Sequence, residues 1–286
     1  MAASSETLTS NVGGSTYALG YTCEENERLI RQAAFLEPIT ERFFRGAGIG
    51  PGQRVLDLGS GLGDVSMLLA RIVGPAGEVV GLEREESSIA RARERVGAAG
   101  LGNVQFVRTD LGEFSNDDSF DAAVGRFILM FLPDARSVLR SVVRAVRPGG
   151  ILAFQEPTWK PMMALESGLP LWFRTRTMIH ETFVRYGVNP EMGIDLYRIF
   201  QEIGLPAPST HLEIPLGATR EYSEMLSQCA KSVLPLSERF GVSFAELGDF
   251  SSLANRLQSE LVAANTVAPY APLVGSWARK PSQAGG

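Results

Sequence analysis

The chain has 286 residues, of which 44% are hydrophobic and 21% charged, a composition typical of an ordinary globular protein and unlike that of a disordered one. Its 27 Lys and Arg residues are outnumbered by 32 Asp and Glu, so the net charge of −5 offers no basic surface for a phosphate backbone. We therefore expect no nucleic-acid partner. A chain of this length can form one elaborated α/β domain or a domain with a cap.

No segment of the sequence indicates export or membrane insertion. Residues 1–14 lack the charged start and the apolar core of a secretory signal, and every apolar run falls short of the roughly 18 residues that a membrane-spanning helix needs. The two cysteines, Cys23 and Cys229, lie far apart and are expected to be free thiols. These features favour a soluble, cytoplasmic protein without a membrane span.

The N-terminal part of the chain predicts helices that lead into a buried strand. Apolar residues recur at approximately helical spacing over 24–45, interrupted only by Pro38, which indicates one or two helices. The glycine-rich connector 46–53 follows, and the apolar run 54–58 is typical of a strand in the interior of a parallel sheet.

Strand and helix signals alternate regularly from residue 54 to residue 156. This alternation predicts an α/β fold with a Rossmann-like, doubly wound and mostly parallel sheet. Further strands are expected at 78–83, 104–108, 120–124 and 150–155, and helices at 62–73, 86–99 and 134–146.

Beyond residue 156 the pattern changes. Residues 157–190 hold three prolines before a helical segment and no strand candidate, so we expect an inserted helical cap. The elements expected here are helices at 171–186 and 195–203, a strand at 211–215, two or three helices within 222–265, and a closing strand at 274–280. The chain would then divide into a tail (1–16), lid helices with a cofactor-binding core (17–156), the cap with the remaining core elements (157–280), and a tail (281–286).

The segment 55–63, VLDLGSGLG, places three glycines between an apolar strand and a helix. Glycine tolerates positive φ and lacks Cβ, so a ligand can lie against backbone N–H groups there. A dinucleotide-binding turn usually reads G-x-G-x-x-G, whereas this turn reads G-x-G-x-G and follows Asp57. The carboxylate of Asp57 suits a ligand with cationic groups, such as S-adenosylmethionine, better than it suits the anionic pyrophosphate of a dinucleotide. The alternative is a turn whose glycines serve packing alone.

Polar residues also follow the next three strands. Glu83 is placed to accept hydrogen bonds from both ribose hydroxyls, or else to face a helix dipole. Asp110 can accept from the adenine amine while Leu111 covers the ring, or it can serve a turn alone. Gly125 gives a ligand access to backbone, and Arg126 can pair with a carboxylate of cofactor or substrate, or form a surface ion pair.

These residues together resemble the class I S-adenosylmethionine-dependent methyltransferases, in particular the small-molecule branch that includes the ubiquinone and menaquinone biosynthesis methyltransferases. The resemblance covers residues 54–156 through VLDLGSGLG, VRTDL, FDAAVGRFILMFLPD and VRPGG. It implies S-adenosylmethionine as the cofactor. The implied contacts are Asp57, Gly59, Ser60, Gly61 and Gly63 with methionine and ribose, Glu83 with the ribose hydroxyls, Asp110 and Leu111 with adenine, and Gly125 and Arg126 near the methionine end.

The segment before the first strand is similar to the N-terminal lid of bacterial and fungal small-molecule members. The likeness rests on YALG at 17–20 and ERLIRQ at 27–32. It implies that Tyr17 and Gln32 close over the cofactor, although an ordinary packing role is the alternative for Tyr17.

Methyl transfer requires alignment rather than a protein nucleophile. The acceptor lone pair must lie about 3–3.5 Å from the methyl group, with water excluded. A hydroxyl or carbon acid also needs a base, for which His180 on the cap helix and Glu156 after the fifth strand are the candidates; a histidine on a mostly apolar helix is otherwise a core residue. No His/Cys cluster has the spacing of metal ligands.

The expected cap is rich in Trp and Met, which favours an aromatic or lipophilic small-molecule acceptor, although the same side chains can equally form core. They are Trp159, Met162, Met163, Trp172, Phe173, Met178 and Phe183. An NAD-dependent oxidoreductase is one alternative, disfavoured by the glycine spacing. A catalytically silent member of the fold, binding a partner through the cap, is another, disfavoured by the complete glycine turn with Glu83 and Asp110. The choice among O-, N- and C-acceptors and the oligomeric state are left open.

Overall fold

The computed structural model describes residues 22–115 and 120–282. Its centre is a seven-stranded sheet in the order β3-β2-β1-β4-β5-β9-β6, in which β9 runs antiparallel to both neighbours and the other pairs are parallel. The strands are β1 (Arg54–Leu58), β2 (Glu78–Glu83), β3 (Val104–Arg108), β4 (Phe120–Arg126), β5 (Val146–Pro157), β6 (Ser209–Glu213) and β9 (Leu273–Arg279). The predicted Rossmann-like α/β class and mostly parallel sheet are confirmed.

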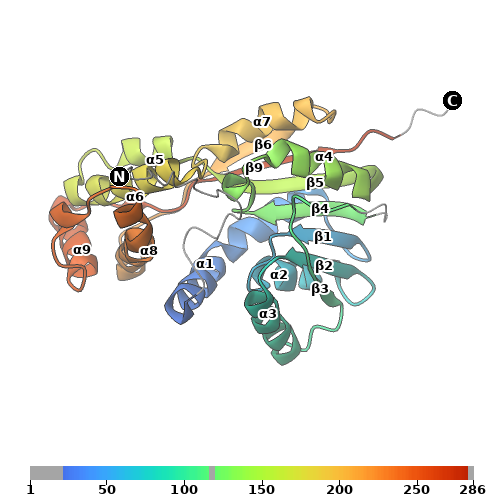
Figure 1. Cartoon of the computed structure of the whole chain (residues 1–286), viewed down its shortest axis with the longest axis horizontal. Helices are drawn as coiled ribbons and strands as arrows, with labels where there is room; N and C mark the ends of the chain where they lie inside the picture. Colours follow the sequence, from blue (N-terminus) through green and yellow to red (C-terminus); the bar gives the residue numbers. More distant parts are fainter. Residues whose placement is uncertain (1–21, 116–119, 283–286) are drawn as a thin grey trace, which may run out of the picture.

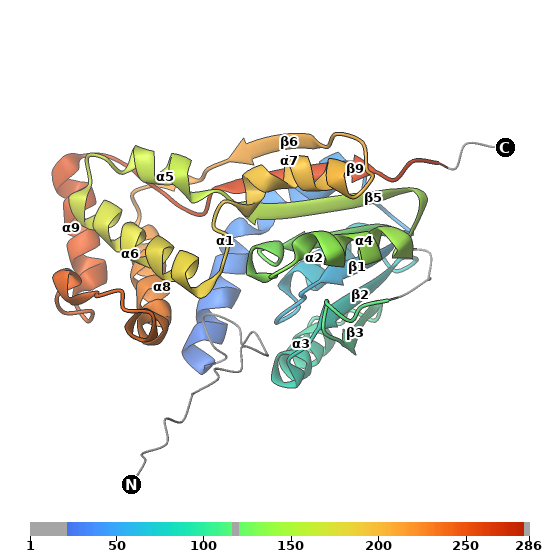
Figure 2. The ribbon, with the colours of Figure 1, turned by 45° about the horizontal axis from the view of Figure 1, so that its top comes forward.

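Helices cover both faces of this sheet. One layer contains α1 (Cys23–Ala47), α2 (Asp64–Val73) and α3 (Glu86–Ala98), and the other α4 (Ala135–Ala145) and α7 (Met192–Glu202). Figure 2 shows α4 and α7 in front of the sheet, with α1 passing behind it. The alternation within β1 explains the two layers, because Val55 packs with the side chains of α1 and α2 whereas Leu56 and Leu58 belong to the opposite core. Such a strand is buried on both faces, as its apolar run predicted.

The first helix is continuous despite its internal proline. Thr22 accepts a hydrogen bond from Glu25 N at 3.1 Å and so caps the start of α1, and Gly48 ends the helix in the left-handed conformation. Pro38 lies inside, so the one-or-two-helix prediction resolves to one helix. Its C-terminal half packs on the sheet, while its N-terminal half extends past the sheet toward the cap (Figure 1).

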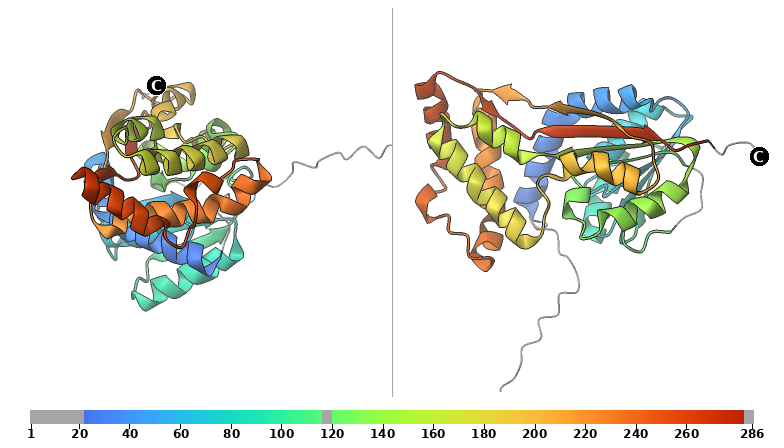
Figure 3. Two further views of the ribbon diagram at one scale, coloured as in Figure 1. Left: turned by 90° about the vertical axis from the view of Figure 1, so that its left-hand side faces the viewer. Right: turned by 90° about the horizontal axis from the view of Figure 1, so that it is seen from above.

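The cap contains more of the chain than the insertion expected at 157–190. Helices α5 (Trp159–Leu165), α6 (Pro170–Tyr186), α8 (Arg220–Arg239) and α9 (Leu253–Ala264) gather at one end of the molecule, away from the sheet (Figures 1 and 3). The remaining short elements are η1 (Leu129–Phe131), η2 (Ala245–Leu247), β7 (Leu216–Gly217) and β8 (Ala268–Pro269). The helices predicted within 222–265 therefore pack on α6, since α8 and α9 share their core with it.

Polar contacts hold α6 to α9. Glu260 accepts hydrogen bonds from the backbone N–H groups of Leu171 and Trp172, which are unpaired donors of the first turn of α6. The Trp172 side chain is fully buried and donates from Nε1 to Leu257 O at 3.0 Å. Trp172 is thus a core residue of the cap. Across residues 22–115 and 120–282, no helix combines the length and apolarity needed to cross a membrane.

Candidate functional site

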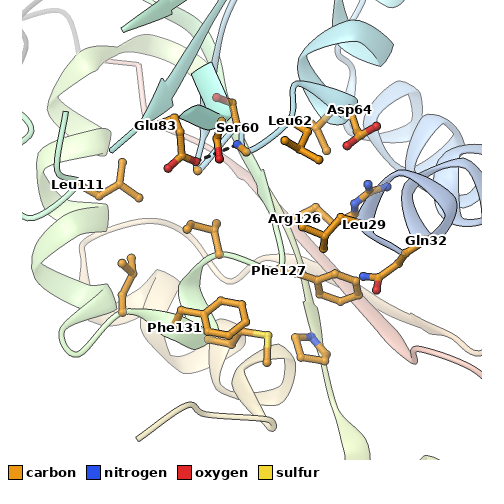
Figure 4. A pocket seen from close by; sticks show the side chains of 18 of the residues that line it. Leu29, Gln32, Ser60, Leu62, Asp64, Glu83, Leu111, Arg126, Phe127 and Phe131 are labelled. Atoms are coloured by element: carbon orange, nitrogen blue, oxygen red, sulfur yellow. Dashed lines mark hydrogen bonds between the residues drawn. The ribbon is translucent and has the colours of Figure 1, made fainter. Parts of the chain in front are cut away.

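A cavity of about 720 Å³ lies where the sheet, α1 and the cap meet. The loops after β1, β2, β3 and β4 form one wall, and the side chains of α1, α5, α6 and α8 form the rest. In Figure 4, Glu83, Ser60 and Leu111 lie on one side of the hollow, and Arg126, Leu29 and Gln32 on the other. This position, beyond the carboxyl ends of parallel strands, is where open α/β sheets bind ligands.

The glycine turn after β1 is built around a side chain from the loop after β4. Gly59 has φ +62°, and a Cβ placed on it would lie 2.3 Å from Ile128 Cδ1. A Cβ on Gly125 would lie 2.7 Å from Ile128 Cγ2, so both glycines make room for this one isoleucine. Gly59, Gly61 and Ile128 line the cavity, whereas Gly125 does not. Gly125 therefore acts through Ile128 rather than by exposing backbone.

Ser60 supplies a polar atom without a partner inside the turn. Its backbone N–H donates to Leu82 O at 2.9 Å, while its buried Oγ has no hydrogen bond to any described residue. A buried hydroxyl left unpaired costs about 1–3 kcal/mol, and Ser60 lines the cavity. A bound polar ligand would satisfy this group.

Glu83, at the end of β2, is oriented by three backbone donors. Its Oε2 accepts from Gly61 N at 2.9 Å, and its Oε1 accepts from Arg84 N at 2.9 Å and Glu85 N at 3.0 Å. A carboxylate has about four acceptor positions, so the open one lies on Oε2. The carboxylate is thus fixed in place at the cavity wall with capacity for a further donor.

Asp110 and Leu111 lie beside Glu83 on the same wall, after β3. Asp110 Oδ1 accepts from Gly112 N at 2.8 Å, a local turn that leaves the exposed carboxylate at the rim of the cavity. Leu111 is buried and presents its side chain to the hollow (Figure 4). Asp110 therefore stabilises a local turn and also lines the cavity, so its two predicted roles are compatible.

The opposite wall is formed by α1 and the end of β4. Arg126 donates from Nη1 to Thr40 Oγ1 at 2.9 Å, and burial lowers the pKa of its guanidinium while Asp64 and Asp57 oppose that shift. Gln32 lies next to it, and its Oε1 accepts from Arg28 Nη1 at 2.7 Å and from Tyr270 Oη at 3.2 Å. Both of these hydrogen bonds use the Gln32 amide oxygen, so its NH₂ group is available to donate to a ligand.

Arg28 forms a buried ion pair with Glu25 of the same helix, and Glu25 links α1 to the cap. Arg28 donates to Glu25 from Nε at 2.8 Å and from Nη2 at 2.6 Å, and Ser232 of α8 donates to the same carboxylate at 2.7 Å. Sequence reasoning missed Arg28 and Tyr270. The spacing of Arg28 and Gln32, four residues apart on one helix, was a signal for the first, whereas Tyr270 is brought in by a contact between distant segments.

Asp57 and Gly63, which the sequence predicted to contact methionine and ribose, are not among the described residues that line the cavity. Asp57 is buried beneath the turn and accepts a hydrogen bond from Ser66 Oγ of α2 at 2.6 Å. Burial raises the pKa of Asp57 to about 7, against the effects of Ser66 and Arg126. Gly63 is the N-cap residue of α2. Both residues hold the helix that follows the turn.

Glu156 is fully buried and caps the short helix η1. It accepts hydrogen bonds from the backbone N–H groups of Ile128, Leu129 and Met130 at 2.9, 2.8 and 3.2 Å. The carboxylate does not line the cavity. The structure thus gives Glu156 a positioning contact with the loop that carries Ile128, and the prediction of a base gains no geometric support.

His180 also lies outside the cavity lining. Its Nε2 is 3.6 Å from Glu191 Oε1, and its ring centroid is 6.1 Å from that of Trp159. Glu191 in turn accepts from Thr158 Oγ1 at 2.7 Å, next to the start of α5. The contacts of His180 are therefore with the residues that hold Trp159 in place. Tyr17, which the resemblance placed over the cofactor, lies outside the described residues.

The pH dependence of stability offers a test of the Glu156 contacts. Burial raises the pKa of Glu156 from 4.5 to about 7, so between these values the folded protein holds a proton that the unfolded chain releases. The free energy of unfolding should therefore fall as the pH rises through this window. We expect Glu156→Gln to reduce that slope by up to about 1.4 kcal/mol per pH unit in urea unfolding from pH 4.5 to 7.5. Asp57, whose pKa is also raised to about 7, contributes equally to the slope of the wild-type protein and of Glu156→Gln. Identical slopes for the two proteins would therefore contradict a raised pKa of Glu156.

No group of three or more His, Cys, Asp or Glu side chains in the described ranges is placed to hold a metal ion.

Comparison with known proteins identifies the family to which the chain is similar. A family model described as "Methyltransferase domain" matches residues 49–204. The ubiquinone/menaquinone biosynthesis C-methyltransferase UbiE of Vibrio vulnificus is 37% identical over 121 residues, which is 41% of this chain and 46% of that protein. UbiE of Ectopseudomonas mendocina is 38% identical over 123 residues, 41% of this chain and 48% of that protein. The chain thus spans about half the length of these relatives.

Solved structures share the fold at low sequence identity. A putative methyltransferase from Bacillus halodurans superposes with a TM-score of 0.57 at 16% identity, covering 84% of this chain and 98% of the other. The [4+2]-cyclase SpnF gives 0.55 at 20% identity, covering 86% and 82%. Because one of the two is named for a different reaction, the likeness speaks for the fold alone.

Proposed function

The chain belongs to the methyltransferase family, with S-adenosylmethionine as its cofactor, and we propose that it transfers the methyl group to a small aromatic or lipophilic molecule. One observation carries the proposal. A single cavity joins the glycine turn and Glu83, which suit a nucleoside, to an apolar wall from the cap, which suits an acceptor. Both reactants of a methyl transfer can therefore be held in one cavity.

The residues of the sheet wall fit the cofactor. The unpaired Ser60 Oγ and the open acceptor position on Glu83 are groups that polar atoms of the cofactor, such as its ribose hydroxyls, would satisfy. We assign a ribose hydroxyl to Glu83 and the adenine to Asp110 and Leu111. Arg126 and Gln32, on the far wall, are assigned to the amino-acid end. The cofactor supplies an activated methyl group when bound.

The cap wall would orient the acceptor and exclude water. Its side chains are mostly apolar, and edge-to-face contacts fix the aromatic ones, with ring centroids 5.7 Å apart for Trp159 and Phe183 and 6.5 Å apart for Phe183 and Phe131 of η1, outside the cap. Alignment of the reactants in such a pocket accounts for much of the rate of a displacement reaction. Trp159, Met162 and Phe183 were among the cap residues expected to wall an acceptor, whereas Trp172, Phe173, Met163 and Met178 lie outside the lining.

The experiment that tests this function combines binding with turnover. The purified protein is titrated with S-adenosylmethionine, S-adenosylhomocysteine and NADH, and then incubated with methyl-labelled cofactor and a panel of lipophilic phenols, amines and carbon acids. We expect binding of the first two ligands and label transfer to at least one acceptor class. Binding of NADH alone would reject the proposal. Cofactor binding without transfer would instead favour the silent, partner-binding member of the fold.

We also place the protein in the cytoplasm. Cys229 is a free thiol that lines the cavity, and free thiols are typical of reducing compartments.

A further inference from the structure

A buried ion pair in the cap has one member facing the cavity. Arg176 of α6 donates from Nε to Glu166 Oε1 at 2.7 Å, and the two side chains are 4% and 0% exposed. Its Nη2 also donates to Pro269 O at 3.1 Å. Arg176 lines the cavity, whereas Glu166 lies behind it. The pair thus presents a guanidinium, and not a carboxylate, to the hollow.

Part of the Arg176 guanidinium has no partner. A guanidinium carries five N–H donors in a planar fork, of which Glu166 and Pro269 engage those of Nε and Nη2. No described residue accepts a hydrogen bond from Nη1. Since Arg176 is almost entirely buried, the cavity is the place where an acceptor for this edge can sit. An Arg edge of this kind matches the two oxygens of a carboxylate.

The charges around the cavity are divided between its two halves. Among the described residues that line it, the sheet domain and α1 contribute four acids and three arginines, namely Asp64, Glu83, Asp110 and Asp134 with Arg28, Arg84 and Arg126, which leaves one excess negative charge on that side. The cap contributes Arg176 and no acid. Glu166 offsets the arginine incompletely, because its Oε2 lacks a partner and burial raises its pKa against the effect of Arg176. The cap half is therefore the more positive one.

Apolar side chains surround the exposed edge of Arg176. Its Cζ lies 5.8 Å from the centre of the Trp159 ring, and Trp159 packs edge-to-face on Phe183. Met162, fully buried, completes this wall. A charged hydrogen bond formed in such surroundings is poorly screened by water, which strengthens it.

We propose that the methyl acceptor is a carboxylic acid whose carboxylate binds Arg176 and whose apolar body packs on Trp159, Met162 and Phe183. This inference rests on the methyltransferase function proposed above. A monoanion is favoured over a phosphate monoester, because Glu166 already offsets part of the single positive charge and would repel a dianion. The carboxylate thus anchors the acceptor in the cap with its reacting atom directed to the sheet half.

Binding of matched acids and amides tests the proposal. The protein loaded with S-adenosylhomocysteine is titrated by calorimetry with benzoate, 2-naphthoate and decanoate, with the three corresponding amides, and with 2-naphthyl phosphate. We expect at least one acid to bind about tenfold or more tightly than its amide, as one charge-assisted hydrogen bond implies. Equal affinities, no binding of any acid at millimolar concentration, or tighter binding of the phosphate would overturn it.

Two variants assign the preference to Arg176. The double variant Arg176→Met/Glu166→Gln removes the cation without leaving a buried unpaired carboxylate. We expect it to lose the acid preference and keep its affinity for S-adenosylhomocysteine, whereas the control Glu166→Gln, which retains Arg176, should keep the preference. An acid preference that survives in the double variant would contradict the proposal. If the wild-type protein did not bind S-adenosylhomocysteine at all, that result would instead reject the methyltransferase function itself.

Discussion

Glu83→Ala is expected to weaken binding of S-adenosylmethionine by about 10- to 100-fold, because a hydrogen bond to a charged acceptor contributes about 1.5–3 kcal/mol. The same change removes the carboxylate that holds the N–H groups of Gly61 and Glu85, so the turn also loses its link to the end of β2. Isothermal titration calorimetry measures the affinity, and thermal unfolding without ligand measures stability. The loss of affinity should exceed the loss of stability.

Glu85→Ala is the matched control for this prediction. Glu85 is the N-cap residue of α3, accepts from Ser87 N, and does not line the cavity. Its removal should cost about 0.5–2 kcal/mol of stability and leave the cofactor affinity unchanged. Equal affinity of Glu83→Ala and the wild-type protein would remove the assignment of the ribose site.

Gly59→Ala is expected to lower the free energy of unfolding by about 2–4 kcal/mol and to abolish cofactor binding. An L-residue at φ +62° is strained by about 1–2 kcal/mol, and the new methyl group would lie 2.3 Å from Ile128 Cδ1, an overpacking that costs about 1–3 kcal/mol. Relief of the clash has to displace either the turn or the loop after β4, and both line the cavity. Urea unfolding and calorimetry give the two quantities.

Gly97→Ala separates this effect from a general response to losing a glycine. Gly97 lies within α3, and a Cβ there meets nothing within 4 Å, so the change should stabilise the protein by about 0.4–1 kcal/mol. In Gly59→Ala/Ile128→Ala the clash is gone but the backbone strain stays, which should restore part of the stability. A Gly59→Ala protein as stable as the wild type, with intact binding, would show that the turn is not closely packed.

Much of the sheet could be predicted from the sequence because each buried parallel strand is a short apolar run, which is a local feature of the sequence. The runs 54–58, 78–83 and 104–108 coincide with β1, β2 and β3. The position of β9 between β5 and β6 had no such signal, since β9 pairs with one strand more than a hundred residues earlier in the chain and with another about sixty residues earlier. For the same reason, the amphipathic pattern of 222–265 predicts helices but not the surface on which they pack.

The residues of the candidate site show the same distinction between local and long-range signals. Gly59, Ser60, Gly61 and Glu83 follow single strands and were predictable, whereas Arg176 reaches the cavity only because the cap places α6 at the end of the sheet where the cavity lies. The position of Asp57 beneath the turn also has a signal in the sequence. Asp57 is two residues from Val55, so its side chain faces α2, where Ser66 lies, and not the ligand side of the turn.

The cap is attached to the molecule at one edge of the sheet. Pro157, where the chain leaves β5 for α5, is paired with Leu273, where the chain returns from the cap into β9, and β6 lies on the other side of β9. Both excursions of the chain into the cap therefore begin and end on three neighbouring strands. Substitutions, insertions or even replacement of a whole helix in the cap leave the register of β1 to β4 untouched. Under the proposed function, acceptor choice could diversify during evolution while the half assigned to the cofactor stays the same, with the Glu25–Arg28–Gln32 contacts of α1 and the bond from Ser232 as the constraint that the two halves share.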